Sequence, residues 1–420
     1  MRCAFCTTNG FAGRAAALRL LSDLCVKSTF SSTPTHAIHY KPMKMARRCF
    51  FSSLFCLLAI LPAFPQSPNQ KLLVFAGTYT DKTDSKGIYA FDFDPSSGTL
   101  TPRGLAVATS NPSWLVIHPN GKWAYAANES GKQSTISAFS VDAKSARLTL
   151  LNQLPALGED PCYLSFDKTG KFLFVANYTS GNVVVFPILP DGKLGEHTSA
   201  IKDSGVLGPN KERQEAPHAH WIEADTNNHL VFVADIGLDC ILIYGFDPNT
   251  GKLVAPPFRV ALAPGTGPRH AFLSPSDRVM YVLGELRSTV TICLPDAHQL
   301  FRATQAISTL PPDFKSRNDA AEIVVPASGS WFYTSNRGLD SIAVFDVRYQ
   351  PMRLISTVST GGKEPRHFAI DPTGRFLLAE NQNSNSIVVF RIDPATGALS
   401  QVSTTEGVPS PVSLVFYPAQ

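Results

Sequence analysis

Hydrophobic residues alternate with polar ones in short runs along this chain, and the same order of runs recurs over most of its length. Each copy opens with Pro, continues as an alternating apolar strand and turns at a Pro/Asp-x-Gly sequence. A second strand then ends in Ala-Asn or Gly-Glu, and a third follows. Clear copies lie at 111–129, 160–188, 267–293 and 364–393. Period-two alternation bounded by such turns predicts half-buried antiparallel strands.

Two more diverged copies lie at 216–246 and 318–347, and a fourth strand often follows an Asp-Pro-x-Thr-Gly-x-Leu turn, as at 247–253. Neighbouring copies are about 45–55 residues apart, which is typical of the four-stranded blades of a propeller. Six copies are complete. The repeat therefore predicts an all-β protein made of blades and needs no second domain.

The seventh copy is divided between the two ends of the repeat region. Strands at 72–80, 87–95 and near Leu100 lie at its start, and the missing inner strand lies at 412–418. A ring closed by strands from both termini leaves no exposed sheet edge, whereas a linear solenoid needs no such split. We therefore predict a seven-bladed β-propeller of four-stranded antiparallel blades over residues 71–420.

Charge and cysteine usage exclude some classes of protein. The formal charge of +4 is small for 420 residues, and part of it lies in a basic N-terminal leader, so the sequence gives no reason to expect nucleic acid binding. Five of the eight cysteines precede residue 60. The remaining three, Cys162, Cys240 and Cys293, are too scattered to form a disulfide framework.

The first seventy residues read as a leader rather than as part of the propeller. Residues 43–66 combine Arg47 and Arg48 with an apolar run and a small-residue end, which is the layout of an export signal. The apolar run is short for a membrane span. Residues 1–42 form an extension that a mis-assigned start codon would explain, with a targeting extension as the alternative. We expect an exported protein if the signal is used and a cytoplasmic one otherwise.

Candidate site residues lie at the strand ends that converge near the propeller axis. They are His218, His220, Asp235, Arg269, His270, Glu285, Arg337, Arg366 and His367. Alternation along a strand puts His218 and His220 on one face, and no other blade has such a pair. Glu285 stands where the other blades usually have Asn.

A structural role competes with a functional one at several of these positions. Pro-Arg-His occurs twice at equivalent places, so His270 and His367 are expected to serve blade geometry. Asp235 shares its place in the blade with Asn128 and other asparagines, and a short polar side chain there can bond a turn.

Several of these segments together resemble a known family. The Gly-Pro-Arg-His…Gly-Glu-Leu pair at 267–286, the Pro-His-Ala-His at 217–220, the Ser-Asn-Arg ending at Arg337 and the opening at 77–100 are similar to the propeller-type lactonases. That family includes bacterial 6-phosphogluconolactonases and fungal carboxy-cis,cis-muconate cyclases. The resemblance covers 71–420 and implies a metal-independent site without a cofactor. It assigns catalysis to His220, Arg269, Glu285 and Arg337, with His218 close by.

These residue types suit lactone hydrolysis. Glu285 or His220 could activate water as a base, and Arg269 and Arg337 could stabilise the oxyanion or hold a carboxylate or phosphate. Asp235 and Arg366 would join His218 in binding the substrate. No G-x-S-x-G nucleophile is evident, so an acyl-enzyme is not expected.

Other functions remain open on the sequence alone. A lactonising cyclase would use the same residues to orient a carboxylate and move a proton, and a non-catalytic propeller would only bind a ligand or a protein. A calcium-dependent gluconolactonase-type site is disfavoured, since no acidic quartet is evident. The expected partner is a small-molecule lactone as substrate. The protein itself is expected to be a monomer. A phosphorylated lactone fits a cytoplasmic protein, and an unphosphorylated or aromatic-derived one fits export.

Overall fold

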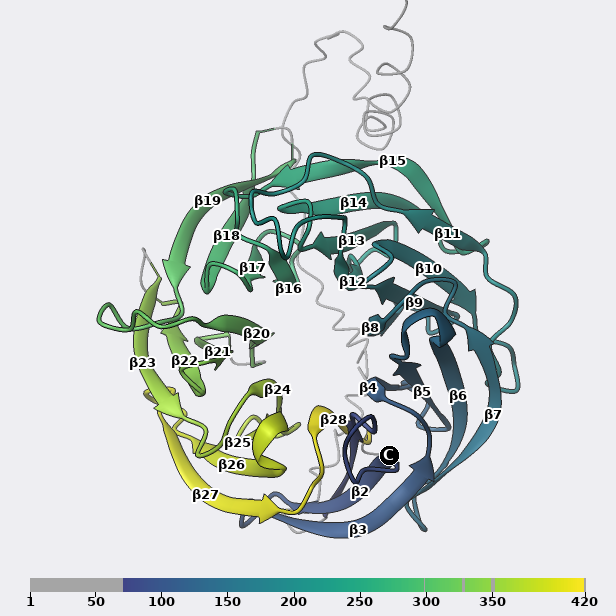
Figure 1. Cartoon of the computed structure of the whole chain (residues 1–420), viewed down its shortest axis with the longest axis vertical. Helices are drawn as coiled ribbons and strands as arrows, with labels where there is room; N and C mark the ends of the chain where they lie inside the picture. The colour runs from purple at the N-terminus through teal and green to yellow at the C-terminus, as the bar shows by residue number, and fades with distance from the viewer. Residues whose placement is uncertain (1–70, 298, 327–328, 349–351, 419–420) are drawn as a thin grey trace, which may run out of the picture. The chain divides into compact units, whose positions relative to one another are not determined.

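Seven four-stranded antiparallel sheets form the structure, a computed structural model that describes residues 71–297, 299–326, 329–348 and 352–418. Figure 1 shows the sheets arranged as blades around a central channel. The predicted seven-bladed propeller is confirmed. The extension at 1–42 and the export signal at 43–66 lie outside the described residues.

Six of the blades are continuous in sequence, each with its innermost strand first. They are β4 (Pro112–Ile117), β5 (Trp123–Asn128), β6 (Thr135–Asp142) and β7 (Arg147–Pro155); β8 (Pro161–Phe166), β9 (Phe172–Asn177), β10 (Asn182–Pro187) and β11 (Ser199–Lys202); β12 (Ala219–Ala224), β13 (Leu230–Asp235), β14 (Cys240–Asp247) and β15 (Lys252–Ala261); β16 (Pro268–Leu273), β17 (Met280–Gly284), β18 (Thr289–Pro295) and β19 (Phe301–Ser308); β20 (Asp319–Val324), β21 (Trp331–Arg337), β22 (Ser341–Asp346) and β23 (Arg353–Ser359); β24 (Pro365–Ile370), β25 (Phe376–Asn381), β26 (Ser386–Ile392) and β27 (Leu399–Glu406). Two short 3-10 helices, η1 (Gly131–Gln133) and η2 (Gln382–Ser384), follow β5 and β25.

The seventh blade joins the two ends of the described chain. Its strands are β28 (Pro411–Phe416), β1 (Leu72–Thr78), β2 (Gly87–Asp94) and β3 (Thr99–Ala108), in that order from the channel outward. Val74 pairs with Phe416 and Gly77 with Ser413, and Figure 1 shows the yellow β28 in the same blade as the purple-blue β2 and β3. The ring is therefore closed by hydrogen bonds between the two ends of the repeat region, as the split copy predicts.

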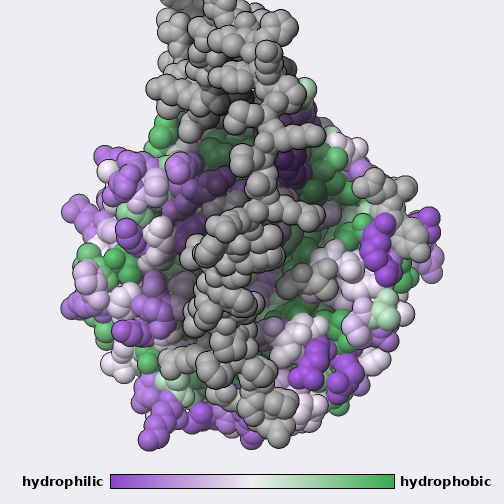
Figure 2. Space-filling model, turned by 180° about the vertical axis from the view of Figure 1, so that it is seen from behind, coloured by the Kyte–Doolittle hydropathy of each residue, from purple (hydrophilic) through white to green (hydrophobic). Residues whose placement is uncertain are grey.

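The hydrophobic core lies between neighbouring sheets rather than in one central mass. Trp221, 1% exposed, belongs to a cluster that joins Phe174 of one sheet to Met280 two sheets further on. The outermost strands β7 and β15 instead consist mostly of exposed residues, with few buried ones. Figure 2 shows hydrophilic side chains at the rim of one face, with hydrophobic ones set between them. This packing leaves the channel end free to carry polar residues.

A β-bulge near the start of the innermost strand recurs in every blade. The pairing between the innermost and second strands shifts there in all seven sheets. The residue left without a pairing partner is His220 in β12, Arg269 in β16 and Arg366 in β24. A bulge redirects the side chain of its extra residue. Three of the candidate residues therefore occupy the same bulge position in three different blades.

Candidate active site

A carboxylate surrounded by guanidinium groups lies at the centre of the candidate site. Glu285 directly follows β17, and its backbone is fixed on both sides, since its N–H donates to Gly267 O at 2.8 Å and its carbonyl accepts from Ala320 N at 3.2 Å. Its Oε2 lies 3.0 Å from Arg269 Nε and 3.1 Å from Arg337 Nη2. Its Oε1 accepts a short hydrogen bond from Arg213 Nη2. The structure thus brings together three of the four residues predicted to be catalytic.

Register corrects one expectation about Glu285. The residue that pairs with the first proline of the blade is Asn128, Asn177 or Asn381 in other blades, but Gly284 in this one. A Cβ on Gly284 would lie 2.6 Å from Thr266 Cγ2 and 2.8 Å from its carbonyl oxygen, which explains the glycine. Glu285 is therefore one residue beyond the Asn position, and the interpretation that it replaces Asn is wrong.

The Asn position itself is structural. The Nδ2 of Asn177 donates to Ala156 O at 3.2 Å, and that of Asn381 donates to Thr360 O at 3.1 Å. Each bond ties the end of the second strand to the segment that enters the blade, in agreement with the expected turn-bonding role.

Two of the arginines carry buried N–H groups that no hydrogen bond satisfies. Arg269 Nε and Arg337 Nη2 have no hydrogen-bond partner among the described residues, although both lie near Glu285. At 3.0–3.1 Å these contacts are ion pairs without an aligned hydrogen bond. Buried donors of this kind are costly and are seldom left unpaired in a folded protein. They are available to an acceptor in the site.

His220 supplies an unpaired nitrogen to the same region. It is 4% exposed, and its Nδ1 has no hydrogen-bond partner among the described residues. Burial lowers the pKa of His220 well below its usual value, and the charges of Arg269 and Arg366 act in the same direction. The imidazole is therefore neutral at physiological pH and can accept a proton.

The electrostatics distinguish the two candidate bases. The arginines overcome the effect of burial and lower the pKa of Glu285 to about 2. Burial, with Arg337 and Arg366, lowers the pKa of Arg269 to about 10. A carboxylate held this strongly in its charged form is a poor acceptor for a proton. His220 differs from Glu285 in that its Nδ1 has no hydrogen-bond partner among the described residues, and this free nitrogen makes it the candidate base.

His218 contacts the site through Tyr178. Its Nδ1 lies 3.0 Å from Tyr178 O, its Nε2 lies 3.1 Å from Glu215 Oε1, and its ring stacks on that of Tyr178 with centroids 4.5 Å apart. The edge of Tyr178 also meets His220, at 5.7 Å between centroids. Both histidines thus pack against one tyrosine, although His218 precedes β12 and His220 occupies its bulge.

Asp235 does not join the arginine cluster. It is 0% exposed, and its Oδ1 accepts hydrogen bonds from His218 N and Leu238 N, both at 2.9 Å. In this structure the carboxylate holds the backbone that carries His218.

Arg366 lies on the other side of the channel end, with its guanidinium over the ring of Tyr79 at 5.5 Å. Tyr79 in turn donates to Glu129 Oε2 at 2.8 Å. Through its charge Arg366 still acts on the cluster, since it lowers the pKa values of His220 and Arg269.

Sequence reasoning missed Arg213. It lies in the irregular segment 203–218, where Asn210 Oδ1 accepts from Glu212 N at 3.1 Å and from Arg213 N at 3.2 Å. Arg213 Nη1 also lies 3.9 Å from Asp319 Oδ1. The only sequence signal was the length of this connection, which replaces the short Ala156–Asp160 segment of the preceding blade.

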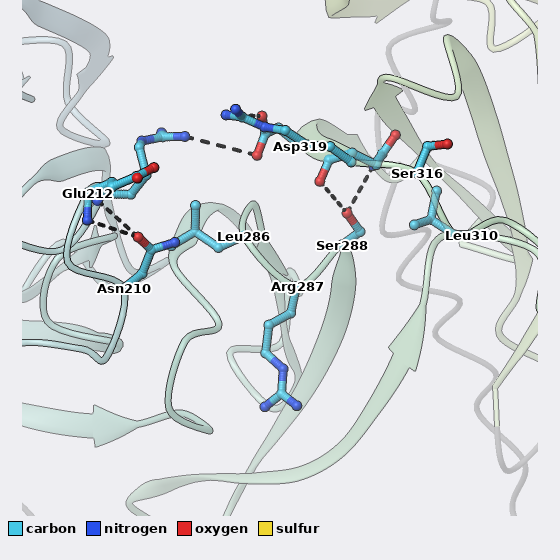
Figure 3. Close-up of a pocket in the computed structure, with 11 residues that line it drawn as sticks. Asn210, Glu212, Leu286, Arg287, Ser288, Leu310, Ser316 and Asp319 are labelled. Carbon is cyan, nitrogen blue, oxygen red and sulfur yellow. Dashed lines mark hydrogen bonds and ion pairs between the residues drawn. The ribbon is translucent and has the colours of Figure 1, made fainter.

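A cavity of about 420 Å³ opens beside this cluster, with Arg213, Asp319 and Ser288 in its wall. Figure 3 shows Asn210 and Glu212 on one side of it and Ser316 and Leu310 on the other. Arg213 is the member of the cluster that lines this cavity, whereas Arg269, Glu285 and Arg337 are not among its lining residues. Within the described ranges, no group of three or more His, Cys, Asp or Glu side chains could hold a metal ion, and no helix is long and apolar enough to cross a membrane.

The fold is a seven-bladed β-propeller, and buried His, Arg and Glu side chains gather at the strand ends of neighbouring blades. Residues 73–416 match the family described as "Lactonase, 7-bladed beta-propeller". The chain belongs to this family, and it is an enzyme of the lactone-hydrolysing carboxylic-ester hydrolase class. The resemblance identified from the sequence is thereby confirmed.

Named relatives agree with this assignment. The chain is 36% identical over 351 residues to a 6-phosphogluconolactonase of Bacillus subtilis, a match that covers 82% of this chain and 98% of the relative. A 6-phosphogluconolactonase of Formosa agariphila is 34% identical over 78% of this chain and 95% of the relative. The solved structure of a periplasmic gluconolactonase from Pseudomonas aeruginosa superposes with a TM-score of 0.77 at 30% identity, covering 83% and 99% of the two chains.

Proposed function

We propose that this protein hydrolyses a sugar-acid lactone of the 6-phosphogluconolactone type, with His220 as the base and Arg269 and Arg337 as the oxyanion-stabilising groups. The observation that carries the proposal is the set of three buried, unpaired polar atoms, His220 Nδ1, Arg269 Nε and Arg337 Nη2. One can accept a proton and two can donate hydrogen bonds. This is the combination that water attack on a carbonyl requires.

In the proposed reaction, water adds to the lactone carbonyl and transfers a proton to His220. The carbonyl oxygen becomes an oxyanion, which the Arg269 and Arg337 N–H groups stabilise. The bond between the carbonyl carbon and the ring oxygen then breaks, and the ring oxygen takes the proton back from His220. Water has been consumed, and the product is the open-chain hydroxy acid.

Glu285 has a different role in this scheme. Because its pKa of about 2 keeps it ionised, it offsets the mutual repulsion of Arg213, Arg269 and Arg337 rather than taking a proton. Arg269 can therefore stay buried, and all three arginines charged, before a substrate arrives.

The experiment is hydrolysis of gluconolactone and of its 6-phosphate by the full chain, followed by pH-stat titration with and without EDTA. We expect turnover that EDTA does not reduce, with a large loss in His220→Ala. His229→Ala is the control, since His229 is an exposed histidine whose Nδ1 bonds Asn227 O at 2.8 Å. Absence of turnover on both lactones would remove the proposal.

The choice between the two lactones is linked to the N-terminal segment. We propose that residues 43–66 act as an export signal, and the periplasmic relative shows that this fold operates outside the cytoplasm in another species. An exported enzyme would meet unphosphorylated lactones. Sequencing the N-terminus of the mature protein tests this, and a chain that retains residues 43–66 would contradict it.

A further inference from the structure

We propose that His270 is a positioning residue that holds the Arg269 guanidinium as a neutral hydrogen-bond acceptor, and that Glu322 fixes the tautomer that makes this possible. Its catalytic consequence rests on the proposed function. The hydrogen-bonding arrangement itself does not.

The arrangement follows from which groups can donate. Arg269 Nη1 lies 3.2 Å from His270 Nε2, and His270 Nδ1 lies 3.0 Å from Glu322 Oε1. An arginine has no acceptor and an ionised carboxylate has no donor. His270 therefore accepts at Nε2 and donates at Nδ1, which only the neutral Nδ1–H tautomer can do.

Burial makes this arrangement stable. Arg269, His270 and Glu322 are 3%, 1% and 5% exposed, so water does not compete for their hydrogen bonds. Burial lowers the pKa of His270 to about 4 despite the opposing effect of Glu322. The pKa of Glu322 is lowered against the effect of burial, and the hydrogen bond that neutral His270 donates to its Oε1 favours the ionised form.

The groups around this pair come from several blades. His367 Nε2 lies 3.6 Å from Glu322 Oε2, and His367 Nδ1 lies 2.8 Å from Glu380 Oε2. The ring of His270 also meets those of His220 and Tyr163, each at 5.1 Å, and that of Trp114 at 5.4 Å. His367 therefore lies within ion-pair distance of Glu322, although Glu322 Oε2 has no hydrogen-bond partner among the described residues.

The second contact of Arg269 completes the restraint. Its Nη1 also donates a short hydrogen bond to Ala321 O. With Nη1 held by Ala321 and His270, the Nε of Arg269 stays 3.0 Å from Glu285 Oε2. A guanidinium fixed in this way loses little freedom when a substrate binds, which is the benefit of a pre-organised oxyanion donor.

The repeat provides an internal comparison. Arg366 and His367 occupy the same two positions in their blade as Arg269 and His270, but His367 binds Glu380 while Arg366 lies over Tyr79. The Pro-Arg-His tripeptide therefore does not by itself join its arginine to its histidine. The Arg269–His270 contact depends on Glu322, which β20 contributes from the next blade.

A direct test is the protonation state of His270 in the full chain labelled with 15N-histidine, with the resonance assigned from its loss in His270→Gln. We expect a neutral Nδ1–H imidazole at pH 7 that remains neutral until the pH approaches about 4. An Nε2–H tautomer or an imidazolium at pH 7 would overturn the proposal. This readout needs no activity, so it stands even if no lactone is hydrolysed.

Kinetics then test positioning. His270→Phe removes the acceptor and should lower kcat roughly ten- to a hundred-fold with little change in KM, whereas His270→Gln, whose carbonyl can accept from Arg269, should recover part of the loss. When Arg269 is already replaced by Met, adding His270→Phe should not lower kcat any further. An equal loss in both backgrounds would mean that His270 acts independently of Arg269. His118→Asn is the buried-histidine control, since His118 bonds Gly170 O in another blade.

Discussion

Glu285 Oε2 lies 3.0 Å from Arg269 Nε, yet no aligned hydrogen bond joins the two groups. The carboxylate balances the charge of the guanidinium while leaving its Nε–H free. In the proposed mechanism, this separation of charge balance from hydrogen bonding lets Arg269 stay charged when buried and still donate to a substrate.

Replacing Glu285 by Gln should expose this role. With the carboxylate gone, three guanidinium groups repel one another, so both kcat and the melting temperature at pH 7 should fall. Because the folded-state pKa is depressed from 4.5 to about 2, ionised Glu285 contributes stability above about pH 4.5, and this is lost as the pH falls toward 2. The contribution is on the order of 3 kcal/mol at most.

Calorimetry of wild type and Glu285→Gln between pH 7 and pH 3 measures how much ionised Glu285 contributes to stability. The difference in melting temperature should shrink as the pH falls. A difference that stays constant over this range would show that the charge of Glu285 does not carry its effect.

Arg337 should matter to the rate more than to folding. Its side chain is 9% exposed, and Arg337→Met removes one proposed oxyanion donor, so kcat should fall about 10²–10³-fold. Arg391→Met is the matched control, since Arg391 is exposed on β26 and lies over Phe376. Steady-state kinetics check this, and a similar kcat in the two variants would remove Arg337 from the mechanism.

The pH profile should identify the base. The lowered pKa of His220 means that its neutral form persists well below the usual histidine value of about 6.5, because burial, Arg269, His270 and Arg366 all disfavour the charged ring. We expect kcat/KM to stay constant from pH 7 to below pH 6 and to fall only in more acidic solution. In His220→Ala, kcat/KM should be about 10²–10⁴-fold lower, and it should no longer fall in acidic solution. A wild-type limb centred near 6.5 would contradict the assignment.

The fold could be predicted from the sequence because the repeat is encoded in local patterns. Alternation and turn residues recur in each copy, and the split copy at 72–80 and 412–418 implies ring closure without any knowledge of distant contacts. The site was only partly predictable. His220, Arg269 and Arg366 stand out as titratable residues in a repeated position, and the bulge that redirects them is a consequence of strand pairing that no single strand reveals.

The remaining site residues depend on contacts between blades. Arg213 comes from an irregular connection with no periodic signal, and its partner Glu285 lies in the next blade. Glu322 likewise meets His270 only because β20 lies beside β16 in the neighbouring blade. Such pairs are set by the geometry of the ring, so sequence spacing does not indicate them.

Asp203 and Asp235 form a buried pair of carboxyl groups away from the arginines. Burial, and then the charge of Asp235, raise the pKa of Asp203 well above its usual value. The folded form keeps a proton that the unfolded chain releases above about pH 4, so this pair stabilises the protein at low pH and the contribution is lost as the pH rises through the folded-state pKa.

Asp203→Asn should therefore raise the melting temperature at pH 7–8. The amide oxygen can still accept the hydrogen bond that Tyr244 donates to Asp203 at 2.6 Å, and its NH₂ can donate to Asp235. The gain should be roughly 1–3 kcal/mol. Asp167→Asn is the contrasting control and should destabilise, because Asp167 accepts from Phe172 N at 2.8 Å and from Asn228 Nδ2 at 2.8 Å. A lower melting temperature in Asp203→Asn would contradict the conclusion that the folded Asp203–Asp235 pair keeps a proton.

Ring closure should determine whether the propeller unfolds as one unit. A chain that ends before Pro411 lacks β28, which leaves β1 without its inner partner and uncovers part of the cluster formed by Leu72, Val74 and Leu414. We expect this chain to lose its single cooperative thermal transition and to bind hydrophobic dyes, because an open ring exposes a sheet edge and a core face. A chain that ends after Tyr417 keeps all of β28, including the hydrogen bond from Tyr417 OH to Gly121 O at 2.8 Å, and serves as the control. Equal melting temperatures and equal dye binding for the two chains would show that the six continuous blades are stable without closure.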